Sequence, residues 1–338
     1  MLLYKIFFLI FYIYFWIIYP YIYYIPALFL NNRIESSYHI RSIAQKISTV
    51  GFKYVFNTDL YFAESKQPIL SNILKNNNLI DIIISNHISS LDITIITSYL
   101  NYLKINNFNY FAKKEMNYIP GLGLFTYFSL DIILNRKWDE DKHILNDQIN
   151  KIIDNINENY CKHVIIIFPE GTRISNEKLL EGQTFSKLNN FPIYNNLLVP
   201  KTKGLYHTIN YLKEKKRLGK IWDISLIIDK LNSRLSIFNN INGIYCIMRE
   251  IKINSDNYNN PEIFKNYFLK YWKDKDYLLS NYNKFIYYKV PNDDKYLTFI
   301  KIILIISSIC LFTNKYSIYF IILLIVIFYT IIIFKIKI

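Results

Sequence analysis

The sequence predicts an α/β domain with a mostly parallel sheet flanked by helices, lying between apolar segments at the two ends of the chain. Three observations support this prediction. The middle of the 338-residue chain carries short β-branched runs, these alternate with helix-like stretches, and both ends are long apolar runs. Alternating strand and helix patterns are typical of α/β domains. Apolar runs of about 20 residues are typical of membrane-spanning helices.

Five runs in the middle of the chain predict buried strands. They are nearly continuous in Ile, Val and Leu, as in parallel strands that are covered on both faces. These runs are residues 82–84, 132–134, 164–168, 197–199 and 224–228. Residues 142–158 predict a helix, whose apolar residues recur at helical spacing: Leu145, Ile149, Ile152, Ile153 and Ile156.

The apolar ends of the chain predict membrane segments. Residues 1–30 are too long for a signal-peptide core and have no small-residue cleavage site, so they predict an uncleaved N-terminal anchor. A buried core helix is the alternative for this segment. Residues 296–334 form two apolar runs around a polar turn and predict a C-terminal helical hairpin. Lys335 and Lys337 follow the hairpin and favour the cytosolic side of a membrane.

Charge and cysteine usage narrow the class of protein. A formal net charge of +14 is compatible with nucleic acid, a membrane surface or an anionic substrate. Zinc-finger spacing, RNP-like aromatic motifs and basic heptad helices are all missing from the sequence, so we expect no nucleic-acid partner. Cys161, Cys246 and Cys310 are far apart and form no CxxC motif, which favours a reducing, cytosol-facing environment.

The first motif with side chains suited to catalysis is NHISSLD, residues 86–92, directly after a predicted strand. Ligands of open α/β sheets bind beyond the carboxyl ends of strands, where a catalytic base is expected, and His87 lies there. Five residues on a straight helix separate two side chains by about 140°, so His87 and Asp92 meet only if a turn precedes the helix that begins near Asp92. The carboxylate then bonds one imidazole nitrogen and leaves the other free to take a proton. The alternative is a capping Asp92 and an incidental His87.

A second motif, FPEGTR at residues 168–173, also follows a predicted strand. Gly171 permits close backbone approach, and Arg173 can clamp a phosphate through two N–H groups. Glu170 is suited to orient substrate hydroxyls or to hold Arg173. A plain strand-to-helix turn is the alternative for these residues.

Two weaker motifs carry glycine and basic residues. Residues 113–123, KKEMNYIPGLG, predict a flexible turn at 120–123, and a short strand ends at Asn135 and Arg136. Residues 197–204, LLVPKTKG, predict a strand that runs into a basic turn. The basic run at residues 213–220 is either a solvated helix face or a contact for anionic lipid headgroups. His143 and His163 lack the spacing of metal ligands, so we predict no metal site.

Together the four motifs resemble the four blocks of the glycerolipid acyltransferase family, the 1-acylglycerol-3-phosphate acyltransferases. RKWDED at 136–141 and PKTKG at 200–204 are similar to the eukaryotic branch that includes lysocardiolipin acyltransferase. The resemblance covers about residues 86–229 and implies a glycerolipid-acyltransferase-like αβ domain. One departure is Leu130-Asp131, where many members carry glycine.

The resemblance implies roles for named residues. His87 would be the general base and Asp92 its partner. The candidate substrate-binding residues are Lys113, Gly123, Arg136, Glu170, Gly171, Thr172, Arg173 and Pro200. The expected domains are an anchor at 1–30, a connecting segment at 31–75, the catalytic domain at 76–235, a C-terminal cytosolic extension at 236–295 and the hairpin at 296–334.

The implied reaction is transfer of a fatty acyl group from acyl-CoA to lysophosphatidic acid, as a step of phospholipid biosynthesis. Acyl-CoA would be a co-substrate, no cofactor would be needed, and membrane lipids would be partners. The expected location is the endoplasmic reticulum membrane with the catalytic domain facing the cytosol. Alternative acceptors are lysocardiolipin, another lysophospholipid or glycerol 3-phosphate. A protein that binds and shapes membranes without catalysis is the alternative from a different class.

Overall fold

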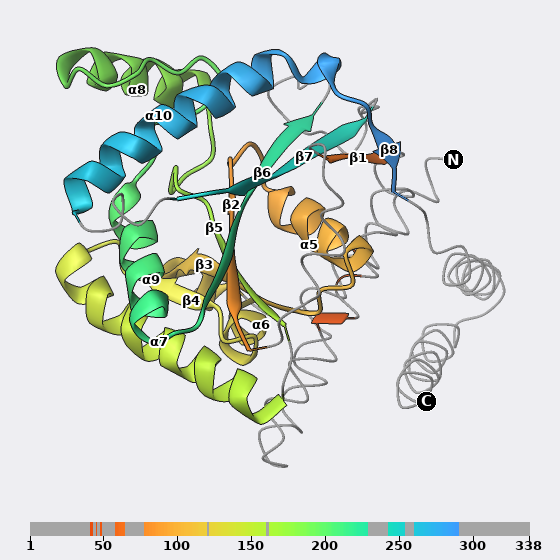
Figure 1. The fold of residues 1–338 in the computed structure, drawn as a ribbon, viewed down its shortest axis with the longest axis vertical. Helices are drawn as coiled ribbons and strands as arrows, with labels where there is room; N and C mark the ends of the chain where they lie inside the picture. The colour runs from red at the N-terminus through yellow and green to blue at the C-terminus, as the bar shows by residue number, and fades with distance from the viewer. Residues whose placement is uncertain are drawn as a thin grey trace, which may run out of the picture. The chain divides into compact units, whose positions relative to one another are not determined.

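The structure of the chain, a computed structural model, describes residues 41, 42, 45, 48, 58–64, 78–119, 122–159, 162–228, 243–253 and 260–290. The described residues form an eight-stranded sheet with the order β4-β3-β5-β2-β6-β7-β1-β8 (Figure 1). The strands are β1 (Leu60–Glu64), β2 (Ile80–Ser85), β3 (Asn107–Lys113), β4 (Ile132–Leu134), β5 (His163–Ile167), β6 (Leu218–Ile228), β7 (Ile244–Ile251) and β8 (Tyr288–Lys289).

The sheet is mostly parallel, as predicted. The strands β4, β3, β5, β2 and β6 all run in the same direction. β7 is antiparallel to β6, β1 is parallel to β7, and β8 is antiparallel to β1. The runs predicted at 82–84, 132–134, 164–168 and 224–228 correspond to β2, β4, β5 and β6. Their β-branched composition is explained by burial on both faces, since all six residues of β2 and all five of β5 are buried.

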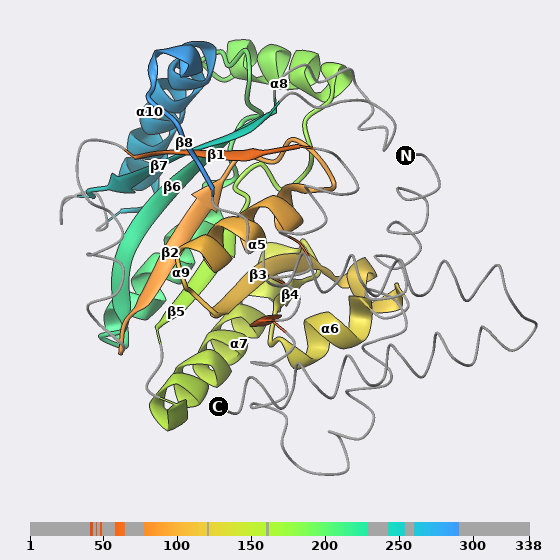
Figure 2. The same cartoon turned by 90° about the vertical axis from the view of Figure 1, so that its right-hand side faces the viewer.

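Helices cover both faces of the sheet. The described helices are α5 (Asp92–Tyr102), α6 (Leu122–Phe128), α7 (Trp138–Asn159), α8 (Asn176–Leu188), α9 (Thr202–Glu214) and α10 (Pro261–Ser280), with short 3-10 turns η1 (Lys114–Tyr118) and η3 (Tyr282–Lys284). α7, α9 and α10 lie on one face and α5 on the other (Figures 1 and 2). The predicted helix at 142–158 is therefore confirmed as α7.

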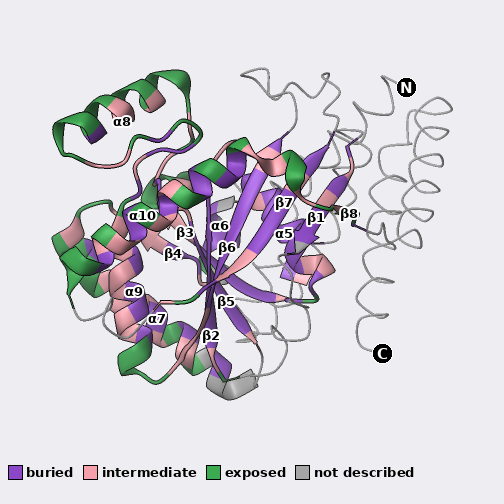
Figure 3. Ribbon diagram, turned by 45° about the horizontal axis from the view of Figure 1, so that its top comes forward, coloured by how far each residue is buried: buried purple, intermediate pink, exposed green. Residues whose placement is uncertain are grey.

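The main core lies between the sheet and the layer formed by α7, α9 and α10. Ile82 and Ile84 of β2 pack there against Ile149 of α7 and Ile209 of α9. This core explains why the apolar residues of α7 recur every three or four positions. α8 differs from these helices, because Ser186 is its only buried residue and the helix lies at the margin of the fold (Figure 3).

One predicted strand is wrong. Residues 197–199 form a loop, although Leu197 and Leu198 are buried as the apolar pattern indicated. The backbone of Leu198 bonds to side chains instead of a neighbouring strand. Its N–H donates to Glu170 Oε1 at 2.9 Å, and its C=O accepts from Trp272 Nε1 at 3.0 Å. Buried backbone groups need partners, and side chains supply them here.

The flexible turn predicted at residues 120–123 is also wrong at its carboxyl end. Leu122 and Gly123 form the first turn of α6. A Cβ at Gly123 would lie 2.2 Å from the backbone oxygen of Asn117. Glycine is therefore required here by the close approach of η1 and α6 rather than by a flexible loop.

Strands on both sides of two predicted domain boundaries belong to one sheet. β1 comes from the predicted connecting segment 31–75, and β7 and β8 come from the predicted extension 236–295. α10, also from the extension, packs on α9 and β6. The predicted membrane segments at 1–30 and 296–334 lie outside the described residues. No helix among the residues that the structure describes is both long and apolar enough to cross a bilayer.

Candidate active site

The two strongest motifs meet at one edge of the sheet. His87 follows β2 and Glu170 follows β5, and these strands are parallel neighbours with Ile84 opposite Ile167. Their carboxyl ends therefore lie side by side, and the loops that leave them are in contact. This is the position where open α/β sheets bind ligands.

His87 and Asp92 form a hydrogen-bonded pair, with 2.7 Å between Nδ1 and Oδ2. Asp92 is the first residue of α5, and a turn at residues 89–91 brings its carboxylate back to the imidazole, as the spacing required. The same carboxylate oxygen accepts the backbone N–H groups of Ile88 and Ser89, and Oδ1 accepts the Ser89 hydroxyl. Asp92 is fully buried, so these donors fix its position.

The structure does not bear out the alternative of a capping Asp92 and an incidental His87, because Asp92 bonds the imidazole and the N-cap of α5 is Leu91, without a side-chain cap bond. The two backbone N–H groups that Asp92 accepts precede the helix, so one residue shapes the turn and orients His87. Because a carboxylate accepts hydrogen bonds, Nδ1 is assigned as the N–H donor and Nε2 keeps its lone pair. Among the described residues nothing bonds Nε2, and the His87 side chain is 20% exposed.

The backbone of His87 is held on both sides. Its N–H donates to Glu170 Oε2 at 2.6 Å, and its C=O accepts from the N–H of Ile174 at 2.9 Å. The imidazole also stacks on the ring of Phe168, with centroids 4.5 Å apart. Residues 168–174 therefore hold the loop that carries His87 through two hydrogen bonds and one ring contact.

Glu170 has partners that the sequence did not indicate. Its carboxyl group is buried and accepts the N–H groups of His87 and Leu198, whereas no bond to Arg173 is formed. Burial raises the pKa of Glu170 to about 8, while the N–H donors of Leu198 and His87 act to lower it. Glu170 lies on the loop after β5 and therefore links it by hydrogen bonds to the loop after β2 and to the loop at residues 197–200.

Two basic side chains converge on Gly171. Arg136 donates from Nη2 to the Gly171 carbonyl at 2.8 Å. Gly171 has φ +66°, a left-handed conformation that favours glycine, and a Cβ built there would lie 3.4–3.6 Å from the side chain of Lys201. Lys201 is also held by its backbone, which donates to the Pro169 carbonyl at 2.7 Å.

The other candidate substrate-binding residues lie at varied positions. Arg173 is exposed, and its guanidinium has no partner among the described residues. The Thr172 hydroxyl accepts from Lys178 Nζ at 2.7 Å. Pro200 is buried next to Lys201, and Lys113 is exposed at the end of β3. Gly123 packs against Asn117, as described above.

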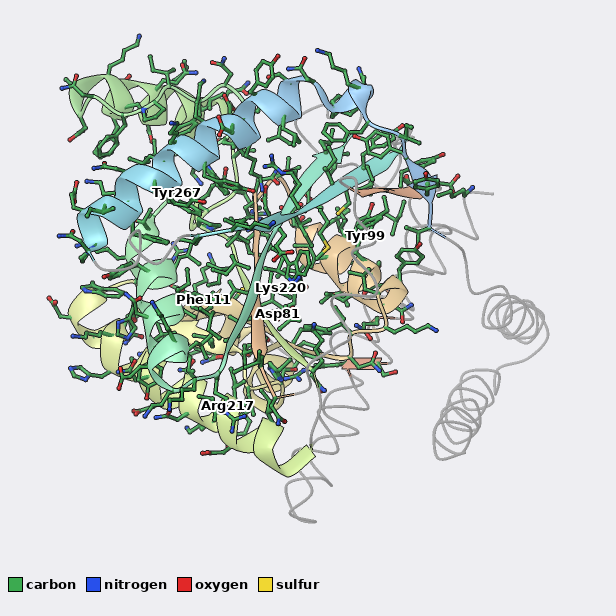
Figure 4. The ribbon with its side chains drawn as sticks, viewed as in Figure 1. Asp81, Tyr99, Phe111, Arg217, Lys220 and Tyr267 are labelled. Carbon is green, nitrogen blue, oxygen red and sulfur yellow. The ribbon has the colours of Figure 1, made fainter. Side chains whose placement is uncertain are left out.

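The basic run at 213–220 lies away from this site. Arg217 donates to the Asn78 carbonyl, and Lys220 pairs with Glu250 at the start of β6. Figure 4 shows Lys220 next to Asp81, to which its backbone N–H donates, with Arg217 lower in the view; these residues lie at the amino ends of β6 and β2. His87 is beyond the opposite end of β2, about 20 Å away at 3.3 Å per residue. No cluster of three metal-ligating side chains occurs in the part of the chain that the structure describes.

Comparison with known proteins identifies the segment that carries this geometry. The family model named Acyltransferase matches residues 70–189. This segment is therefore similar to the acyltransferase family. It includes the His87–Asp92 pair, Arg136 and the FPEGTR loop, while the sheet that holds it continues through β6, β7 and β1.

The curated relatives of this chain have several names. The chain is 29% identical over 116 residues to 1-acyl-sn-glycerol-3-phosphate acyltransferase 3 of Arabidopsis thaliana, covering 34% of this chain and 29% of that protein. It is 28% identical over 148 residues to lysocardiolipin acyltransferase 1 of Mus musculus, covering 43% of this chain and 38% of that protein. The chain thus spans about a third of the length of these relatives.

A solved structure supports the fold. The 1-acyl-sn-glycerophosphate acyltransferase PlsC of Thermotoga maritima aligns with a TM-score of 0.51 at 16% identity, covering 82% of this chain and 96% of that chain. The aligned share of this chain exceeds residues 70–189. The likeness therefore extends the acyltransferase fold beyond the segment that the family model matches.

Residues outside 70–189 support the loops of the candidate site. Asp276 of α10 accepts the backbone N–H groups of Asn195 and Asn196, and Trp272 donates to the Leu198 carbonyl. This loop in turn bonds Glu170 through the Leu198 N–H. No sequence motif indicates these contacts, because Asp and Trp in an amphipathic helix have no distinctive spacing.

A buried ionic cluster joins β6, β7 and α10. Asp223 of β6 pairs with Lys275 of α10 and with Arg249 of β7, and it accepts the hydroxyl of Tyr271 at 2.8 Å. Asp223 and Lys275 are both fully buried. Burial acts to raise the pKa of Asp223, but the positive charges of Lys275 and Arg249 lower it by more than burial raises it. The pKa of Asp223 is therefore below its usual value. Removal of one partner would leave an uncompensated buried charge.

Proposed function

We propose that this chain transfers a fatty acyl group from acyl-CoA to the free hydroxyl of lysophosphatidic acid, giving phosphatidic acid. The observation that carries the proposal is the His87–Asp92 pair at 2.7 Å, with Nε2 of His87 free and basic side chains on the adjoining loop. A binding protein without catalysis has no need for an imidazole oriented by a buried carboxylate.

The proposed chemistry is direct transfer with His87 as general base. Nε2 takes the proton of the acceptor hydroxyl while the hydroxyl oxygen bonds to the thioester carbon of acyl-CoA. The C–S bond then breaks, and the imidazolium returns the proton to the departing thiolate. Asp92 holds the ring in the required tautomer and stabilises its positive charge. Acyl-CoA is the co-substrate, and the reaction as written uses no metal.

The basic side chains suit a phosphorylated acceptor. Arg136 is anchored on the Gly171 carbonyl, and Arg173 is exposed two residues further along the same loop. Guanidinium groups match the geometry of phosphate oxygens. A phosphate held here would fix the acceptor near His87, whose backbone bonds the neighbouring Glu170. Orientation of two substrates in this way supplies much of the rate of such reactions.

A second acceptor class has support of its own. The alignment to the mouse protein named lysocardiolipin acyltransferase 1 covers 148 residues, compared with 116 for the Arabidopsis protein. The proposal therefore includes lysocardiolipin and related lysophospholipids as acceptors for the same base. We further propose that residues 1–30 and 296–334 anchor the chain in the endoplasmic reticulum membrane with the site facing the cytosol. Burial of an acyl chain in lipid gains about 0.8 kcal/mol per CH₂, so the acceptor stays in the membrane, and an anchored enzyme reaches it there.

The experiment uses the full chain in detergent or vesicles with one acyl-CoA and a panel of lysophospholipids and glycerol 3-phosphate. Wild type should form phosphatidic acid, and His87→Ala should reduce kcat by about 10²–10⁴. His143→Ala removes an exposed imidazole on α7 and should leave the rate unchanged. Circular dichroism checks that the fold is retained. If no acceptor is acylated while anionic vesicles are bound, the chain is a lipid-binding protein instead.

A further inference from the structure

Lys201 is a basic residue to which the proposed reaction assigns no role. It comes from the 197–204 segment, yet its side chain lies over Gly171 of the FPEGTR loop. A Cβ at Gly171 would be 3.4 Å from Lys201 Cδ and 3.5 Å from Nζ. The ammonium group therefore reaches the same glycine to which Arg136 donates from another element.

The charges at this glycine are not neutralised by the protein. Within the described residues neither Lys201 nor Arg136 forms an ion pair with a carboxylate. The nearest carboxylate along the chain, Glu170, is buried and occupied by two backbone N–H groups. Two cations next to the same glycine without a paired carboxylate repel one another, and an anion bound near both would relieve that repulsion.

We propose that Lys201 binds the acceptor phosphate together with Arg136 and thereby favours a phosphate monoester over a phosphodiester. This inference rests on the proposed function. A phosphate monoester carries a charge of roughly −1.5 to −2 at pH 7, whereas a diester carries one negative charge. The second cation therefore contributes most to an acceptor with a terminal phosphate, such as lysophosphatidic acid.

The test compares Lys201→Gln with Lys201→Arg in the full chain. The backbone N–H of Lys201 bonds to the Pro169 carbonyl whatever the side chain, so both variants should fold, which thermal unfolding verifies. Lys203→Gln removes the same charge from an exposed position two residues further on and is the matched control. The assay measures kcat and KM for lysophosphatidic acid and for a phosphodiester acceptor such as lysophosphatidylinositol.

The expected result is a rise of about 10- to 100-fold in KM for lysophosphatidic acid in Lys201→Gln, the loss typical of one hydrogen bond to a charged group. The kcat should stay within about twofold, because a contact to the remote phosphate is equal in the ground and transition states. The KM for the phosphodiester should change less, and Lys201→Arg should restore most of the affinity. Lys203→Gln should resemble wild type.

Several results would overturn the inference. An unchanged KM in Lys201→Gln, an equal rise for both acceptors, or an equal effect of Lys203→Gln would each exclude a specific contact while leaving the acyl transfer intact. If wild type acylates no acceptor, the proposed function fails, and calorimetric binding of glycerol 3-phosphate then decides the role of Lys201. Weaker binding by Lys201→Gln than by Lys203→Gln would support the phosphate contact, and equal binding would exclude it.

Discussion

The carboxylate of Glu170 is bonded to the backbone of His87, with 2.6 Å between Oε2 and the His87 nitrogen. Its other oxygen accepts the Leu198 N–H at 2.9 Å. Glu170 therefore acts on His87 through the main chain, and its buried position keeps both bonds away from water. From this arrangement we expect Glu170 to act as a positioning residue for His87.

Glu170→Gln should lower kcat and leave the KM for the acceptor nearly unchanged. Above the pKa of about 8 the ionised carboxylate accepts both backbone N–H groups, whereas the amide retains one acceptor oxygen and turns its NH₂ toward the second donor, so one bond to a loop is lost at pH 8.5 and above. Misplacement of a catalytic group by about 1 Å can cost about 10² in rate, and an unsatisfied buried donor costs about 1–3 kcal/mol in stability. Steady-state kinetics and urea unfolding measure the two effects. Glu177→Gln, on exposed α8, is the control, and a raised KM with normal kcat would assign Glu170 to acceptor binding.

The stability of the domain should depend on pH through Glu170. Its folded pKa is about 8, compared with a usual value of 4.5, so the folded state binds more protons than the unfolded state between these values. The contribution is complete below pH 4.5 and is lost as pH rises through 8. Urea unfolding at pH 5, 6.5 and 8 should show a decline in wild type that is smaller in Glu170→Gln.

Asp131 adds to the same trend, because burial raises its pKa to about 7 from 3.8. Asp131→Asn is therefore needed as a second variant to separate the two carboxyl groups. Parallel pH profiles for wild type and Glu170→Gln would show that Glu170 has an ordinary pKa in the folded state.

Gly123→Ala should destabilise the domain by about 1–3 kcal/mol, the usual cost of an added carbon in a packed region. The new Cβ would lie 2.2 Å from a backbone oxygen, which a side-chain rotation cannot relieve. Gly182→Ala is the matched control, since its Cβ would be 3.8 Å from Val199 Cγ2 within helix α8. That change should stabilise the helix by about 0.5–1 kcal/mol. Chemical unfolding compares the two, and equal effects would argue against close packing at Gly123.

Asp276→Ala should reduce both stability and activity, although it lies far along the chain from the motifs. The backbone N–H groups of Asn195 and Asn196 would lose their buried acceptor, at a cost of about 1–3 kcal/mol. The loop also carries Leu198, so Glu170 and His87 should shift with it. Asp274→Ala changes an exposed acid on the same helix and serves as control. Full activity in Asp276→Ala at a temperature where it is folded would show that α10 does not position the base.

The local sequence pattern was sufficient to predict the helices and strands nearest the His87 and Glu170 motifs. The β-branched runs predicted β2, β5 and β6, which are buried on both faces over most of these runs, and also the short, half-buried β4. The five-residue spacing of His87 and Asp92 predicted a turn before α5, and that turn is present. The contribution of Glu170 was not predictable, because its partners are backbone groups 28 and 83 residues away along the chain.

Long-range pairing explains what the sequence missed. β1 and β7 pair across more than half of the chain, and no local pattern in residues 60–64 indicates a partner at 244–248. The run at 197–199 has the composition of a buried strand but lacks a neighbouring strand, so periodicity misassigned it. Lys201 was visible only as part of a basic turn, since its approach to Gly171 depends on how two loops pack.

The N–H of Val290 donates to the C=O of Leu60 at 2.8 Å, so the first and last strands of the sheet meet at one edge. The short strand β8 therefore covers part of an edge that β1 would otherwise expose. An uncovered strand edge is a template for pairing with another chain. These few residues thus protect the sheet against edge-to-edge association.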